Sequence, residues 1–227
     1  MKESIFTNKT VQKIIRLIPA LAFTFFTAYQ IILAIFYDVS RFGRVIGIVF
    51  YLLLTVAAYL DFSEKNTVWV AHSILLITDL ILLFAMRLLN ISAILESLGS
   101  GHPAIVMYFV VYILTQLGTL VLIAGYLTLS ADITERIKQR ALIILMTVAI
   151  VMFAAVLVLE CILMLKYGMN IEISLKVTLV SRVMFFLGFA GIACSLMLPA
   201  PDKKHSEPQE GQYVYSDDNE DEIDLVL

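Results

Sequence analysis

The feature that most constrains this chain is a series of six apolar segments, most of them about as long as a bilayer is thick. They are separated by short polar stretches and take up most of the 227 residues. A helix needs about 20 predominantly apolar residues to cross the hydrocarbon core of a membrane. The expected spans cover residues 17–36, 45–60, 68–89, 104–129, 133–166 and 173–198. The sequence therefore predicts an all-α integral membrane protein with six transmembrane helices.

The composition agrees with this class and argues against a soluble domain. Hydrophobic residues make up 60% of the sequence and charged residues 15%, which is typical of a polytopic membrane protein. We expect one bundle over residues 1–198 and a tail over residues 199–227. The tail holds nine Asp and Glu against two Lys, a balance of −7, so the net charge of −3 leaves +4 for residues 1–198. The sequence lacks the cluster of basic residues that would indicate a nucleic-acid partner.

Local signals set the expected ends of the helices. The first span is interpreted as a retained helix with Pro19 in its first turns, where proline is tolerated. Gly99, Gly101 and Pro103 predict a turn across the loop from Asn90 to Pro103. Asp132 and Glu135 have the spacing of a capping box, so the fifth helix should begin near Ile133.

The loops suggest three successive antiparallel hairpins with both chain ends on one side. Basic residues in the loops of a membrane protein concentrate on the cytoplasmic side. With the N-terminus inside, ten of the 16 Lys and Arg fall in inner segments and four in outer loops, while Arg87 and Arg182 lie within spans. We therefore expect a protein of the plasma membrane with both termini in the cytoplasm.

Glu160 and Arg182 stand at similar depth in the last predicted hairpin. Glu160 comes ten residues before the middle of the turn at Asn170, and Arg182 comes twelve after it. A lone charge inside the bilayer costs about 2.5–3.5 kcal/mol on insertion scales, so the two are expected to pair. The pair is either part of a substrate, ion or proton site or a structural ion pair that locks the hairpin.

A second candidate lies near the centre of the third span, at Asp79. Gln116 occupies the corresponding depth of the fourth span. A carboxyl group in such surroundings should keep its proton or accept a hydrogen bond from a donor such as Gln116 or Tyr112. The functional interpretation is proton or cation coupling, and the alternative is a neutral, hydrogen-bonded Asp that holds two helices together.

Several spans carry polar residues at helical spacing, and these faces should turn away from lipid. They are expected to form interhelical hydrogen bonds or to line a cavity. The last span also carries small residues, which predict close packing against another helix. The polar faces are Thr24, Thr27 and Gln30; Tyr51, Thr55 and Tyr59; and Tyr108, Tyr112, Thr115 and Thr119. The small residues are Ser174, Thr178, Ser181, Gly188, Gly191 and Ser195.

The sequence contains no motif of a catalytic site, a metal site or a cofactor site. The serine-hydrolase elbow, the zinc-protease motif and the phosphate-binding loop are all missing, and the three His residues are scattered. We therefore expect no catalytic residues, no metal and no cofactor. The acidic tail should be disordered.

Two functions remain open. The charges and polar faces favour a protein that binds or transports a small solute or ion, or a membrane subunit of such a transporter. The tail favours equally a sensory or interaction protein that recruits a cytosolic partner. An intramembrane enzyme is less favoured because the motifs are missing. The candidate polar site comprises Asp79, Glu160, Arg182, Gln116 and Tyr112, and the lipid bilayer is the one partner that every alternative requires.

Overall fold

The computed structural model describes residues 8–36, 41–63, 66–89, 91–99, 101–131, 134–168 and 174–198. All regular structure in these ranges is α-helical. The helices are α1 (Lys9–Phe36), α2 (Arg41–Phe62), α3 (Asn66–Leu89), α4 (Ile91–Leu98), α5 (Pro103–Ser130), α6 (Glu135–Tyr167) and α7 (Leu175–Leu196). Residues 199–227, predicted as a disordered tail, lie outside the described residues.

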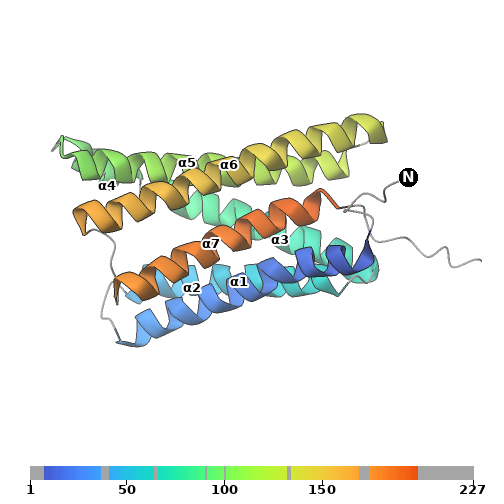
Figure 1. Ribbon diagram of the computed structural model, residues 1–227, viewed down its shortest axis with the longest axis horizontal. Coiled ribbons are helices and arrows are strands. Elements are labelled where there is room, and N and C mark those ends of the chain that lie inside the picture. The colour runs from blue at the N-terminus through green and yellow to red at the C-terminus, as the bar shows by residue number, and fades with distance from the viewer. Residues whose placement is uncertain are drawn as a thin grey trace, which may run out of the picture.

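By their contacts, the six long helices form a closed ring of neighbours. Figure 1 shows them from the side, with their axes roughly along the length of the bundle. Each packs against the next in chain order, and α7 returns to pack against α1. The contact between α5 and α6 is the most extensive and the contact between α3 and α5 the least. The described helices therefore form a continuous ring, in which the three predicted hairpin pairs, α1 with α2, α3 with α5 and α6 with α7, are each in contact and also pack against one another. α1 begins and α7 ends at the same end of the bundle, on the right in Figure 1.

The prediction of a turn across residues 90–103 was wrong in part, because α4 occupies most of it. Apolar residues recur at helical spacing there, at Ile91, Leu95 and Leu98. The prediction gave more weight to the glycines that follow them. The actual turn lies at Gly101, whose φ of 63° suits a residue without a side chain. Pro103 then opens α5, with His102 Nδ1 accepting a hydrogen bond from the Ala104 N–H at 3.3 Å.

Two other helix ends differ from the prediction. α1 begins at Lys9, so Pro19 lies in the interior of the helix rather than in its first turns. α6 begins at Glu135 with Thr134 at the N-cap, and that residue makes no side-chain capping bond. Glu135 is thus the first residue of the helix, where a capping box requires the third. Asp132 and Ile133 lie outside the described residues.

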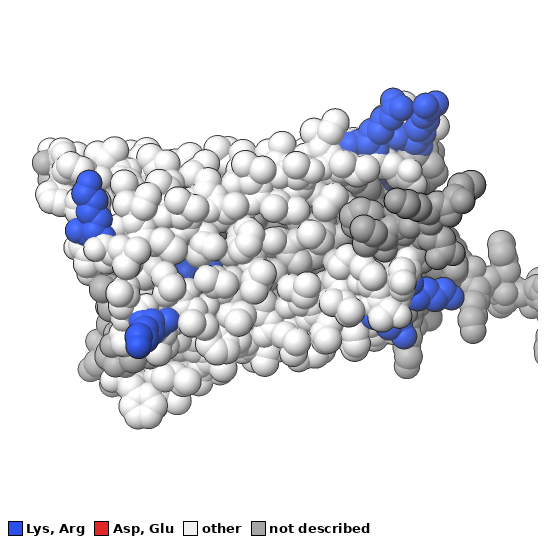
Figure 2. All heavy atoms as spheres, in the orientation of Figure 1, with Lys and Arg blue, Asp and Glu red and all other residues white. Residues whose placement is uncertain are grey.

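The outer surface of the ring is apolar along most of its length. Figure 2 shows Lys and Arg gathered at the two ends of the bundle, with an almost uniformly uncharged middle. Five helices are long and apolar enough to cross a membrane: Lys9–Phe36, Val45–Phe62, Pro103–Leu129, Arg136–Tyr167 and Leu175–Leu196. In α3, which was expected as the third span, the described side chains cover the apolar stretch Ser73–Ala85.

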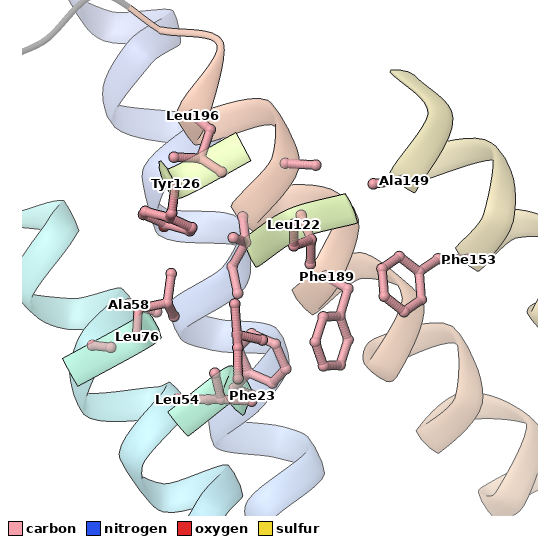
Figure 3. Packing of buried hydrophobic residues seen from close by; sticks show 14 of the residues in the cluster. Phe23, Leu54, Ala58, Leu76, Leu122, Tyr126, Ala149, Phe153, Phe189 and Leu196 are labelled. Atoms are coloured by element: carbon pink, nitrogen blue, oxygen red, sulfur yellow. The ribbon is translucent and has the colours of Figure 1, made fainter. Parts of the chain in front are cut away.

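Phenylalanine rings fill the part of the interior between α1, α6 and α7. The rings of Phe153 and Phe189 stack with centroids 4.7 Å apart, and Phe23 meets Phe189 edge-on at 5.3 Å. Figure 3 shows these side chains pointing toward one another from three helices. Such pairs contribute about 0.5–1.5 kcal/mol each beyond the area they bury.

Two of the small residues of the last span, Gly188 and Gly191, pack closely against another helix, as predicted, and that helix is α1. A Cβ atom added at Gly188 would lie 2.7 Å from the Phe23 ring, and one at Gly191 would lie 2.7 Å from Pro19 Cδ. The two helices approach this closely because both positions lack a side chain.

Candidate functional site

Asp79 lies in the interior of the bundle, on the face of α3 that carries Leu76, Leu80 and Leu83. The residue is 1% exposed, and its three leucine neighbours are buried with it. Neither carboxyl oxygen has a hydrogen-bond partner among the described residues. An ionised carboxylate in such surroundings is unstable unless a positive charge or a proton compensates it. Burial of Asp79 at this position therefore lowers the stability of the fold.

Gln116 of α5 is the second buried polar side chain of this region. It is 4% exposed, and neither its amide nitrogen nor its amide oxygen has a hydrogen-bond partner in the described part of the chain. Thr115 and Thr119, on the same helix, are also buried. Their hydroxyls donate to the carbonyl oxygens of Val111 at 2.7 Å and of Thr115 at 2.9 Å. Each threonine oxygen thus keeps lone pairs that can accept a bond.

Asp79 and Gln116 lie on two helices, α3 and α5, that pack against each other. Leu76 of α3 and Leu122 of α5 belong to the same buried cluster, and Figure 3 shows both in the interior. α3 and α5 pack together and run in opposite directions. Asp79 comes about one turn after Leu76, and Thr119 and Gln116 come about one and two turns before Leu122, so the three residues lie on corresponding stretches of the two antiparallel helices. We call Asp79, Thr115, Gln116 and Thr119 the Asp79 layer.

The expected hydrogen bond from Gln116 or Tyr112 to Asp79 is absent. Among the described residues, both Asp79 oxygens and both Gln116 amide atoms are without partners, so this alternative is not seen. The other alternative, a carboxyl group that keeps its proton, stays a prediction. Tyr112 is half-buried. Matching depth along two helices does not bring two side chains into contact, because the rotation of each helix also decides where they point.

Glu160 and Arg182 form the ion pair that their depth predicted. Arg182 Nε lies 3.5 Å from Glu160 Oε2 and joins α7 to α6. The Arg182 side chain is 18% exposed and the Glu160 side chain 13%, so both are shielded but not sealed. Because Asp79 has no hydrogen-bond partner, the pair and Asp79 do not form one hydrogen-bonded cluster. The five predicted site residues are thus divided between two places.

The predicted polar faces of α1 and α2 join the two helices. Thr27 and Thr55 share a hydrogen bond of 3.1 Å, and Tyr59 Oη lies 3.3 Å from Thr24 Oγ1. Tyr59 is nevertheless 42% exposed, and Tyr108 of α5 is 38% exposed. The expectation that these two tyrosines turn inward was therefore wrong. A tyrosine can keep its ring on an apolar surface while its hydroxyl finds a partner near the edge.

Sequence reasoning missed the burial of Asp61 near the end of α2. Asp61 is 9% exposed, and Tyr126 of α5 is also buried, at 3%. The second span was expected to end at Leu60, which placed Asp61 in a loop. The signal that was overlooked is the helical continuation of α2 to Phe62.

The described residues hold no group of three or more His, Cys, Asp and Glu that could bind a metal ion. Cys161 and Cys194 are free thiols. The arrangement offers a buried acid on α3 and buried neutral oxygen atoms on the neighbouring helix α5, groups of a kind that can bind a positive charge. No protein-family model matches this chain, and no curated protein and no solved structure shows significant similarity to it.

Proposed function

We propose that this chain is a multi-pass protein of the plasma membrane that binds and transports a small solute or ion. Asp79 and Gln116 are the groups that hold the transported species inside the bundle. The observation that carries the proposal is the environment of Asp79, a fully buried carboxyl group whose two oxygens have no hydrogen-bond partner in the described protein.

The structural alternative for Asp79 required a hydrogen bond between helices. A buried Asp strengthens a helix pair only when a donor on the other helix meets it. No described donor does so. An unsatisfied polar group costs about 1–3 kcal/mol, and charged residues inside a membrane mark ion or substrate pathways. A role in ligand binding would explain why a carboxyl group is buried here despite this free-energy cost.

The Glu160–Arg182 pair takes the structural role in this proposal. Each charge has its counter-ion on the adjacent helix, so the pair is compensated without a ligand. The pair holds α6 and α7 together while the Asp79 layer binds the transported species.

The proposed orientation places both termini in the cytoplasm and six helices in the bilayer. It is supported by the excess of Lys and Arg in the inner segments and by α1 and α7 reaching the same end of the bundle. A reporter fused after Leu227 should be active only in the cytoplasm, and activity outside the cell would contradict this orientation. Recruitment of a cytosolic partner by the acidic tail stays a prediction, because the tail lies outside the described residues.

Transport is tested with the full chain reconstituted in liposomes. The vesicles are loaded with a defined mixture of amino acids, sugars, nucleosides and salts, and mass spectrometry follows which compounds leave. Wild-type vesicles should release at least one compound faster than empty liposomes, and Asp79→Asn should reduce that release at least about tenfold. Glu96→Gln, at an exposed carboxylate of α4, is the control and should release at the wild-type rate. Equal rates for wild type and Asp79→Asn would reject the proposal.

A further inference from the structure

We propose that the Asp79 layer binds a single monovalent cation, either a proton or an alkali-metal ion. This inference rests on the proposed function and names the class of ligand at that site.

The charge balance around Asp79 favours one positive charge. α3 packs against α2, α4 and α5, and none of the described side chains on these three helices is a Lys or Arg. The described Arg182 is paired with Glu160. Among the described side chains, the negative charge of Asp79 therefore has no counter-charge on the helices packed against α3, and an anionic ligand would add to the imbalance.

The number of carboxylates argues against a divalent cation. Protein sites for divalent cations usually combine two or more carboxylates with other oxygen ligands. No group of three or more acidic, His or Cys residues exists among the described residues. One carboxylate neutralises one unit of charge, which matches a proton or an alkali-metal ion.

The other polar groups of the layer suit a hard cation. Gln116 supplies an amide oxygen without a partner, and its amide nitrogen and oxygen can exchange places by rotation. The hydroxyl hydrogens of Thr115 and Thr119 are committed to backbone carbonyls, so their oxygens can present only lone pairs. Neutral oxygens and one carboxylate are the ligands that hard cations prefer.

Other titratable groups lie on the helices that pack against α3. Among the described side chains these are Asp61, Tyr51 and Tyr59 of α2, Glu96 of α4, and Tyr108, Tyr112 and Tyr126 of α5. Comparison with Asp79→Asn isolates the contribution of Asp79 itself, because these groups are common to both proteins.

The test is thermal unfolding of the full chain in detergent at constant ionic strength. NaCl, KCl and CaCl2 are each compared with choline chloride, and the series is repeated between pH 5 and pH 8.5. If the ligand is an alkali-metal ion, NaCl or KCl should raise the Tm by at least about 3 °C. If it is a proton, salts should have equal effects and the Tm should fall with rising pH, because the folded state then binds the extra proton.

Each response should disappear in Asp79→Asn and persist in Asp61→Asn, a matched change at another buried carboxylate. Gln116→Leu, which keeps Asp79, should weaken the response to an alkali-metal ion at least about threefold and leave a proton response in place. It serves as the second variant if Asp79→Asn does not fold.

Stabilisation by CaCl2 alone, a response retained in Asp79→Asn, or an equal loss in Asp61→Asn would overturn the inference. So would a wild-type protein whose Tm responds neither to these cations nor to pH. Cation binding without solute release would uphold this inference and reject transport. Solute release that depends on Asp79 but involves no cation or proton would uphold transport and reject this inference.

Discussion

Arg182 Nε lies 3.5 Å from Glu160 Oε2, so that one ion pair connects the last two helices of the ring near the turn between them. Removing one member leaves the other charge without compensation in a shielded place, whereas removing both leaves none. The pair therefore makes a sharp prediction about stability.

Glu160→Gln should lower the free energy of unfolding by roughly 2–3 kcal/mol. This is somewhat less than the 3–5 kcal/mol of a fully buried pair, because both side chains are partly exposed. The double variant Glu160→Gln with Arg182→Gln should recover at least half of the loss. Unfolding in detergent, followed by circular dichroism, measures both values. If the double variant is less stable than Glu160→Gln alone, the pair is not the source of the effect.

Gly191→Ala should destabilise the contact between α1 and α7 by about 1–3 kcal/mol, since the new methyl group would overlap the ring of Pro19. The nearest atoms are Pro19 Cδ at 2.7 Å and the Pro19 backbone nitrogen at 3.1 Å, and a proline ring has little freedom to move away. Gly47→Ala is the matched control, because nothing lies within 4 Å of a Cβ atom there. It should be neutral or stabilising, by up to about 1 kcal/mol. Similar losses in both variants would indicate a general effect of alanine rather than overlap.

The hydrogen bond between Thr27 and Thr55 should give a measurable coupling between α1 and α2. Thr27→Val and Thr55→Val preserve shape and remove the 3.1 Å contact. A double-mutant cycle on unfolding should yield a coupling of about 0.6 kcal/mol, the average for hydrogen bonds between membrane helices. Strictly additive effects would show that the two hydroxyls do not interact in the folded protein.

Gln116→Leu should raise the free energy of unfolding by about 1–3 kcal/mol while impairing transport. The substitution replaces two buried, unpartnered amide atoms by apolar ones of similar volume. Unfolding and solute release are measured on the same preparation. Gln139→Leu, at an exposed position of α6, is the control and should alter neither quantity by much. A loss of stability in Gln116→Leu would mean that the amide supports the fold.

The sequence contained enough information to predict the helices and one part of the site. Long apolar segments specify helices whatever their partners, and the described boundaries of α2, α3, α5 and α7 differ from the predictions by only a few residues. The pairing of Glu160 with Arg182 followed from depth, because a short turn forces two helices to run back alongside each other. The close contacts at Gly188 and Gly191 followed from residue size.

The order of contacts around the ring and the state of Asp79 required the tertiary structure. In a helix that is apolar on all sides, periodicity does not reveal which side faces the interior, so Tyr59 and Tyr108 were placed inward although they are exposed. Depth alone also suggested a hydrogen bond between Asp79 and Gln116 that does not form. The length and apolar composition of each helix are properties of one segment, so they can be counted from the sequence. The rotation of each helix depends on packing between segments far apart in the chain, and that decided which polar groups meet.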